Sequence, residues 1–201
     1  SGGKSQTLTM NWDGNVWAVD SSPNNSQASN HGLNSVSCVS STFCMAVGNW
    51  STGKQSTFTM LWENSTWRIV DSPNVPSSHN YFMSVSCLST TFCMAVGHSI
   101  TPSCSFRTLT AIWDGISWTL VTSPNKLGSL LRSVSCVDSI TCIAVGYNES
   151  AKWHQPLAMK WNGSIWEITE TSIPNYESEL NSVSCVSSTF CMAVGNWSTG
   201  K

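Results

Sequence analysis

Apolar residues occur at alternate positions in short runs along the chain, and Ser, Thr, Asn, Gly and Pro separate the runs. The pattern returns every 49 residues, as SVSCVSSTFCMAVG, SVSCLSTTFCMAVG, SVSCVDSITCIAVG and again SVSCVSSTFCMAVG. Residues 34–54 and 181–201 are identical over 21 positions. Alternation predicts β-strands, and a fixed period of this length predicts stacked or ring-closed repeats that bury their cores against one another.

The first hairpin expected in each repeat lies in this phrase, because two apolar runs flank a Ser/Thr turn. In residues 34–48 the members of its two faces alternate: Val36, Cys38, Cys44 and Ala46 on one face, Phe43, Met45 and Val47 on the other. The second strand is therefore apolar on both faces, which predicts a strand packed between neighbouring sheets.

A second hairpin follows in each repeat, with the form W-x4-W and a turn dipeptide between the tryptophans. The dipeptides are Asp13-Gly14, Glu63-Asn64, Asp114-Gly115 and Asn162-Gly163. Gly, Asn and Asp accept the positive φ of hairpin turns, so the Glu-Asn copy is the weaker form. The first copy has one apolar face, made by Leu8, Met10, Trp12, Trp17 and Val19. Each repeat is thus expected to hold four short antiparallel strands and to end at a proline breaker: Pro23, Pro73, Pro124 or Pro174.

A repeated four-stranded sheet of about 50 residues is the blade of a β-propeller. The phrases SVSC…FCMAVG and W-D-G-x-x-W resemble the Ser/Cys-rich propeller-like repeats of secreted bacterial proteins. More distantly, they are similar to Asp-box and photosystem-assembly-factor blades. The resemblance implies an all-β, propeller-like fold of four repeats, each a four-stranded antiparallel blade with one hairpin disulfide. The box is structural in those families, so the resemblance implies no active-site residue.

The whole chain, residues 1–201, is expected to be a single repeat domain. Complete repeats occupy residues 34–82, 83–131 and 132–180. Residues 181–201 and 1–33 supply the two parts of a fourth, split repeat. It either closes a ring by strand exchange between the termini, which removes two open sheet edges, or continues an array of head-to-tail units. The sequence leaves both arrangements open.

Charged residues make up only 10% of the chain, and the net charge is −2. No cluster of Lys and Arg is present to displace counterions from phosphates, so no nucleic-acid partner is expected. No apolar run reaches the ~18 residues of a membrane span, so no membrane span is expected.

Eight of the nine cysteines form C-x5-C pairs, one pair per repeat. Zinc sites usually use converging C-x2–4-C pairs, and the four histidines lie at unrelated positions, so disulfides are favoured over a metal and no cofactor is expected. The spacing lets both cysteines of a pair face each other across a hairpin. The predicted bridges are Cys38–Cys44, Cys87–Cys93, Cys136–Cys142 and Cys185–Cys191. They predict an oxidising compartment, and hence a secreted or cell-surface protein.

Several further residues are candidates for modification or contact. Cys104 is the odd cysteine, expected either as a buried free thiol or in a bond between chains. Trp50, Trp153 and Trp197 lie outside the W-x4-W hairpins and are candidate contacts to a glycan or a neighbouring subunit. Sequons for N-glycosylation occur at Asn24, Asn49, Asn64, Asn148, Asn162 and Asn196.

The sequence holds no Gly-rich phosphate loop, no G-x-S-x-G elbow and no H-E-x-x-H motif. Asp13 and Asp114 recur only at a turn, so we do not expect an enzyme. We expect a non-catalytic extracellular structural or adhesive repeat protein that self-assembles into a surface fibre or sheath, with other copies of itself as the partner. The alternative is a multivalent, lectin-like propeller that binds an extracellular glycan or protein.

Overall fold

The structure is a computed structural model, and it describes residues 4–126, 128–149, 153–172 and 177–198. These residues form strands and no helix. The strands are β1 (Thr9–Trp12), β2 (Trp17–Asp20), β3 (Asn30–Ser40), β4 (Phe43–Ser51), β5 (Gln55–Glu63), β6 (Thr66–Val70), β7 (His79–Ser89), β8 (Phe92–Ile100), β9 (Phe106–Trp113), β10 (Trp118–Val121), β11 (Ser129–Asp138), β12 (Thr141–Glu149), β13 (His154–Trp161), β14 (Trp166–Thr169), β15 (Glu177–Ser187) and β16 (Phe190–Ser198).

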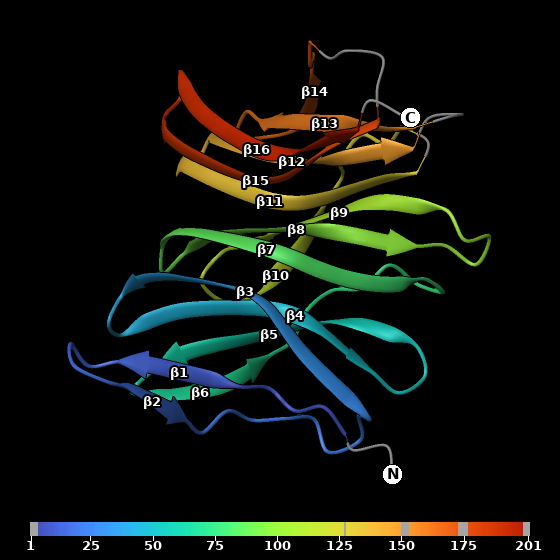
Figure 1. The fold of residues 1–201 in the computed structure, drawn as a ribbon. Helices are drawn as coiled ribbons and strands as arrows, with labels where there is room; N and C mark the ends of the chain where they lie inside the picture. The colour runs from blue at the N-terminus through green and yellow to red at the C-terminus, as the bar shows by residue number, and fades with distance from the viewer. Residues whose placement is uncertain (1–3, 127, 150–152, 173–176, 199–201) are drawn as a thin grey trace.

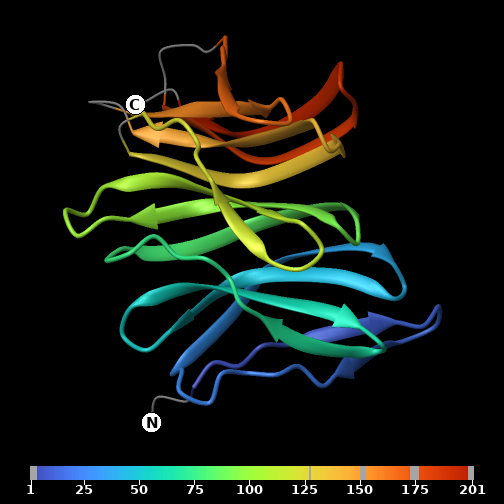
Figure 2. The ribbon, with the colours of Figure 1, turned by 180° about the vertical axis from the view of Figure 1, so that it is seen from behind.

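Antiparallel hairpins build the sheets in chain order. Three sheets are four-stranded, β3-β4-β5-β6, β7-β8-β9-β10 and β11-β12-β13-β14, and two are two-stranded, β1-β2 and β15-β16. Figure 1 shows the sheets stacked in chain order from β1–β2 to β15–β16, and Figure 2 shows the same stack from behind. The prediction of an all-β, propeller-like fold with four-stranded antiparallel blades is confirmed.

The first two strands of each sheet approach each other so closely that the last residue of FCMAVG must be glycine. The register of β3 on β4 pairs Cys38 with Cys44 and shifts between Leu33 and Ser35. Beside this bulge, a Cβ on Gly48 would lie 1.9 Å from the carbonyl oxygen of Gly32. The glycines at the same place in the other hairpins meet a backbone carbonyl in the same way: Gly97, Gly146 and Gly195. Any side chain there would separate the two strands.

The second hairpins use two kinds of turn. In the first copy Asp13 Oδ1 accepts hydrogen bonds from the backbone N–H groups of Asn15 and Val16, both at 2.8 Å, and this closes a four-residue loop between β1 and β2. Asp114 and Asn162 do the same in their copies. Only the Glu63-Asn64 copy has a two-residue turn, in which Asn64 and Ser65 have φ of 51° and 60°. The aspartate in Asp-Gly is therefore an acceptor for backbone N–H groups, which the dipeptide alone did not predict.

Serines in the SVSC phrase join each sheet to the next. Ser35 Oγ accepts a hydrogen bond from the backbone N–H of Val85 (3.2 Å), and Ser37 Oγ accepts one from that of Cys87 (2.9 Å). The same two bonds recur at the next two interfaces, at 3.2 and 3.0 Å and at 3.1 and 3.0 Å. We call this repeated set the serine ladder. It pairs the backbone N–H groups that the first strand of a sheet directs toward the preceding sheet.

The apolar core lies between the sheets. Met45 and Val47 of β4 are buried with Phe82 and Val85 of the next sheet. In β8, Ala95 lies in this same cluster, whereas Met94 on the other face is buried in a second cluster with Leu131 of the third complete sheet. The second strand of this sheet thus packs between two neighbouring sheets, as the sequence predicted.

The two half-sheets lie at opposite ends of the stack (Figure 1). Among the described residues β16 pairs only with β15, and β1 only with β2. The backbone N–H of His31 in β3 donates to the carbonyl of Ser5 (3.0 Å), which ties the β1–β2 hairpin to its neighbour. The described residues thus show no pairing between the two half-sheets, and whether the split repeat closes a ring or continues an array stays a prediction.

Candidate functional site

The cysteines fall into two groups. The eight paired cysteines form four disulfides within the first hairpins, each with a Cα–Cα distance of 4.0 Å: Cys38–Cys44, Cys87–Cys93, Cys136–Cys142 and Cys185–Cys191. Cys104 is a free, exposed thiol in the turn between β8 and β9, with φ of 59°. Burial of Cys104, one of the two states expected from the sequence, is therefore wrong for this chain, because the cysteine lies on an exposed turn.

The sequon asparagines differ in how their side-chain nitrogens are held. Asn148 is buried in β12, so a glycan there would require the strand to separate from its sheet. Asn64 is exposed at the tip of the two-residue turn. The other four donate hydrogen bonds through Nδ2, the atom that would carry a glycan: Asn24, Asn49, Asn162 and Asn196. Asn64 is thus the exposed sequon whose Nδ2 donates no hydrogen bond among the described residues, and glycan occupancy stays a prediction.

The three candidate contact tryptophans are in different surroundings. Trp50 is half-buried and stacks on His31, with 6.5 Å between ring centroids. Trp153 and Trp197 are exposed. Trp197 occupies the same place in its repeat as Trp50, and it is exposed in the half-sheet β15–β16 at the end of the stack.

Identical sequence is buried in one place and exposed in another, and this difference defines the C-terminal open face. Met45 and Val47 are 0% exposed, whereas Met192 and Val194, their counterparts in the identical segment, are both 61% exposed. Phe43 is buried, and its counterpart Phe190 is exposed as well. The face is formed by Ser182, Ser184, Phe190, Met192 and Val194.

At the opposite end of the stack, apolar residues are also exposed although their counterparts in the next repeats are buried. Val36 is 58% exposed, whereas Val85 at the same place in the next repeat is 5% exposed. Trp12 and Trp17 are also exposed, while the corresponding Trp113 and Trp118 are buried. Between the β1–β2 hairpin and the first complete sheet lies a groove of about 580 Å³. Its apolar lining includes Met10, Trp12, Trp17, Val36, Trp62 and Trp67. We call it the N-terminal groove.

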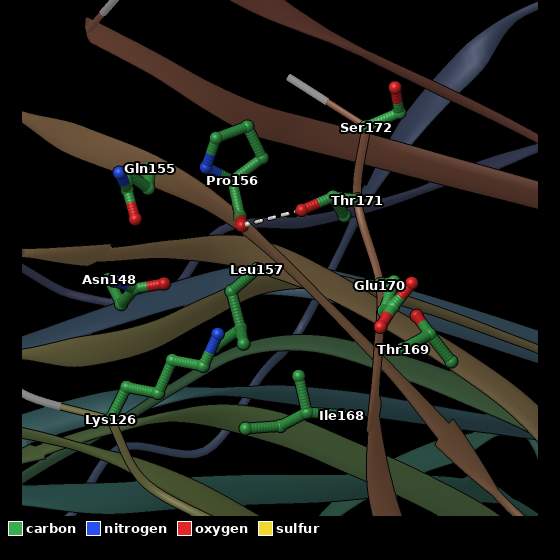
Figure 3. Close-up of a pocket in the computed structure, with 10 residues that line it drawn as sticks. All are labelled: Lys126, Asn148, Gln155, Pro156, Leu157, Ile168, Thr169, Glu170, Thr171 and Ser172. Atoms are coloured by element: carbon green, nitrogen blue, oxygen red, sulfur yellow. Dashed lines mark hydrogen bonds between the residues drawn. The ribbon is translucent and has the colours of Figure 1, made fainter. Parts of the chain in front are cut away.

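A polar cavity of about 720 Å³ lies beside β13 and β14 in the third sheet (Figure 3). Its lining is Lys126, Asn148, Gln155, Pro156, Leu157, Ile168, Thr169, Glu170, Thr171 and Ser172. In the second sheet the backbone N–H of Thr108 donates to Asn125 Oδ1 (2.6 Å) and its hydroxyl bonds to Ser123 (2.8 Å), which holds the loop after β10 against the sheet.

Pro156 takes the place of Thr108 in the third sheet, and proline has neither an N–H nor a hydroxyl to offer. In Figure 3 the Thr171 side chain instead donates to the carbonyl of Pro156, at 3.4 Å. Amide, hydroxyl, lysine and glutamate groups around the hollow offer hydrogen bonds to a small polar ligand. A smaller hollow of about 420 Å³ lies at the corresponding place in the second sheet, although that sheet keeps Thr108.

Arg132 is the centre of a small charged cluster between sheets. It donates to Glu179 Oε2 and to Asn181 Oδ1, both at 2.7 Å, and its guanidinium lies 5.2 Å from the centroid of the Tyr147 ring. Burial, and then the charge of Arg132, lowers the pKa of His98 to about 4, so its imidazole is neutral at pH 7. The arginine charge is balanced by Glu179, so the cluster joins sheets and does not present a free cation to an anionic ligand.

Backbone hydrogen bonds shift the pKa of two turn aspartates. The N–H of Val16, with that of Asn15, holds the pKa of Asp13 below its usual value, and the N–H groups of Ser117 and Ile116 do so for Asp114. Both carboxylates stay ionised as turn acceptors, which accounts for their recurrence.

Among the described residues no three His, Cys, Asp or Glu side chains lie close enough together to hold a metal ion. That part of the chain also has no helix long and apolar enough to span a membrane.

Comparison with known proteins supports the fold alone. No protein-family model matches the chain, and a search of curated proteins also finds no match. Among the solved structures that match is one described as YCF48 bound to D1 peptide, with a TM-score of 0.50 and 14% sequence identity. The match covers 90% of this chain and 52% of the other, so the chain spans about half the length of that protein. The distant similarity to a propeller of the photosystem-assembly-factor type is thereby shown.

Proposed function

We propose that this chain is a non-catalytic, extracellular structural repeat module that works by extending its stack of sheets end to end. The observation that carries the proposal is the difference in side-chain exposure between two copies of one identical segment. Phe43, Met45 and Val47 are buried against the next sheet. Their counterparts in the identical segment, Phe190, Met192 and Val194, are exposed, and the described residues hold no sheet beyond β15–β16 to cover them. A strand that is apolar on both faces is stable only when both faces are covered, so the C-terminal open face calls for another sheet.

Composition and covalent structure support the extracellular location. The four hairpin disulfides fit an oxidising compartment. A surface that is rich in Ser, Thr and Asn and only 10% charged is soluble through hydroxyl and amide groups. We also propose that the chain is related to the Ser/Cys-rich propeller-like repeats of secreted bacterial proteins, which its SVSC…FCMAVG phrases resemble.

A second function, ligand binding, is favoured by the cavity in Figure 3. Its polar lining suits a saccharide or a short peptide, and the similar propeller is described as bound to a peptide. A hollow of about 420 Å³ lies at the corresponding place in the second sheet, but Lys126 and Glu170 line only the cavity of the third sheet. A multivalent lectin would repeat the same lining in every blade. We therefore place the structural function first.

Negative-stain electron microscopy of the unreduced protein tests the proposal, together with sedimentation over a range of concentrations. Rods or fibres with a regular axial repeat are expected. Isolated particles at every concentration would refute end-to-end extension. A thermal shift on titration with oligosaccharides or peptides, lost in a variant with a filled cavity (Ser172→Trp), would favour ligand binding instead.

A further inference from the structure

A residue at the start of the first strand holds the loop that leads into each complete sheet. Its side chain accepts a hydrogen bond from a backbone N–H group in that loop. The three bonds join the N–H of Asn25 to His31 Nε2 (3.0 Å), that of Val75 to Asn80 Oδ1 (3.0 Å) and that of Lys126 to Ser129 Oγ (2.9 Å). One contact is thus made by three different side chains, and of these only the histidine gains a proton near neutral pH.

The hydrogen bond in the first sheet requires a neutral His31. A neutral imidazole has one N–H donor and one acceptor nitrogen, whereas a protonated ring has two donors and no acceptor. Because the backbone N–H of Asn25 is itself a donor, Nε2 carries no proton, and the neutral ring holds its single proton on Nδ1. Protonation of Nε2 sets two N–H groups against each other and removes the bond. Asn80 and Ser129 do not titrate, so the other two bonds do not depend on pH.

The ring of His31 is largely buried, so water does not readily replace the lost bond. The residue is 6% exposed, and its ring stacks on Trp50 and meets Phe58 edge-on, with 6.5 and 5.3 Å between ring centroids. Burial lowers the pKa of His31 below its usual value of 6.5, and the backbone carbonyl of Ser5 opposes that shift. These contacts come from the loop at Asn25, from β4, from β5 and from the segment before β1, and none of the contacting side chains is ionisable.

The bond to His31 holds a tight turn in the connection between β2 and β3. Within this turn the N–H of Ala28 donates to the carbonyl of Asn25 (3.1 Å), and that of Gln27 donates to Asn25 Oδ1 (3.0 Å). Ala28 is buried at the end of the turn. Asn25 therefore closes the turn, and His31 fixes Asn25 to the sheet.

We propose that His31 is an acid-sensitive latch on the connection between β2 and β3. In its neutral state it fixes Asn25 and the turn that Asn25 closes. In acid the protonated ring releases Asn25, and the turn opens while the sheets and their disulfides stay in place. The connections into the second and third sheets have no such switch, because their acceptors are an amide and a hydroxyl. The latch does not depend on the proposed end-to-end extension.

The direction of the pH dependence follows from the shift. The folded-state pKa of His31 lies below 6.5, so the stabilisation from the latch is complete above pH 6.5. It is lost as pH falls through the folded-state value, because the protonated ring is favoured only when the turn is open. Acid therefore opens the turn, and a return to neutral pH closes it.

A second histidine accepts a backbone hydrogen bond but is exposed. His79, the first residue of β7, accepts through Nδ1 from the N–H of Gln55, at 3.2 Å. The first residue of β3 is Asn30, whose Oδ1 accepts a backbone N–H in the same way, at 3.3 Å. Histidine and asparagine thus exchange places between the two repeats, as Asn30-His31 and His79-Asn80. The chain itself shows that asparagine serves as the acceptor at either position, which supplies matched substitutions.

Amide hydrogen exchange followed by NMR tests the latch at single residues. Between about pH 8 and about pH 4.5 the protection factor of the Asn25 amide should fall about tenfold relative to those of Val75 and Lys126, whose acceptors do not titrate. At about pH 8 the ring nitrogen shifts of His31 should show a proton on Nδ1 and none on Nε2. A proton on Nε2 at that pH, or an equal fall at all three amides, would overturn the proposal.

His31→Asn is the informative variant, because Asn80 makes the same bond in the second repeat. It should keep the Asn25 amide protected at both pH values. His79→Asn is the matched control: it makes the same substitution at an exposed histidine and should leave the pH dependence of the Asn25 amide unchanged. The proposal fails if the pH dependence survives in His31→Asn or disappears in His79→Asn. Should His31→Asn not fold, the ring protonation and the three amides of the unaltered chain decide.

Discussion

The duplicated segment allows one substitution to be compared in two environments. Met45 is fully buried between two sheets, whereas Met192, in identical local sequence, is 61% exposed. Truncation of a buried methionine to alanine removes its transfer free energy and leaves a cavity, at a cost of about 2–5 kcal/mol. For Met192, less than half of the side chain is buried and no enclosed cavity forms, so the expected cost in the monomer is below about 1 kcal/mol.

These free energies convert into separable melting temperatures. For a domain of this size 1 kcal/mol corresponds to about 2–4 °C in Tm, so Met45→Ala should lower Tm by about 4–20 °C and Met192→Ala by less than about 4 °C. The assay is thermal unfolding followed by circular dichroism over a dilution series of each variant. In concentrated protein the loss from Met192→Ala should grow, because the side chain is then buried by the next copy.

One result would refute this reasoning. If Met192→Ala lowers Tm as much as Met45→Ala does, at every concentration down to the most dilute, the C-terminal open face is covered within a single chain. The stack would then be closed, and the exposed half-sheet would not describe the protein in solution.

Three further outcomes are expected. Ser86→Ala removes the acceptor for the backbone N–H of Cys136 and should cost about 1–3 kcal/mol in urea unfolding, whereas Ser184→Ala at the open end should cost little in dilute protein. Reduction of the four disulfides should lower stability by about 2 kcal/mol for each bridge, seen as a lower Tm in reductant; an unchanged Tm would show that the hairpins do not depend on them. The folded-state pKa of His98, about 4, lies below the ordinary value of 6.5, so its contribution is complete above pH 6.5 and is lost as pH falls toward 4. The loss should reach about 3 kcal/mol and be absent in His98→Gln, so equal pH profiles of the two proteins between pH 6.5 and 4 would contradict it.

Local interactions made much of the architecture readable from the sequence. Alternation gives the strands, the 49-residue period gives the repeat, and the C-x5-C spacing gives each disulfide, because all three depend on residues close together in the chain. The candidate site was only partly readable. Trp197 was singled out and is exposed at the end of the stack. The alternation that correctly predicts burial of Met45 and Val47 does not reveal that Met192 and Val194, in identical sequence, are exposed.

The remaining features depend on neighbours that are distant in sequence. Nothing in SVSC shows that Ser35 and Ser37 bond to a strand 50 residues away, although the recurrence of both serines in all four repeats was an available signal. The missing N–H of Pro156 likewise matters only in the tertiary structure, where Asn125 binds the corresponding N–H in the preceding sheet.

The sequence by itself determined the strands, the turns and the cysteine pairs, because each is set within a single repeat. Tertiary structure alone decided which copies of identical residues are buried, because burial depends on whether another sheet follows. Residues 34–48 and 181–195 have the same letters and the same local hairpin, and they differ only in their position in the stack. That difference exposes one apolar face, and the proposed function of the chain rests on it.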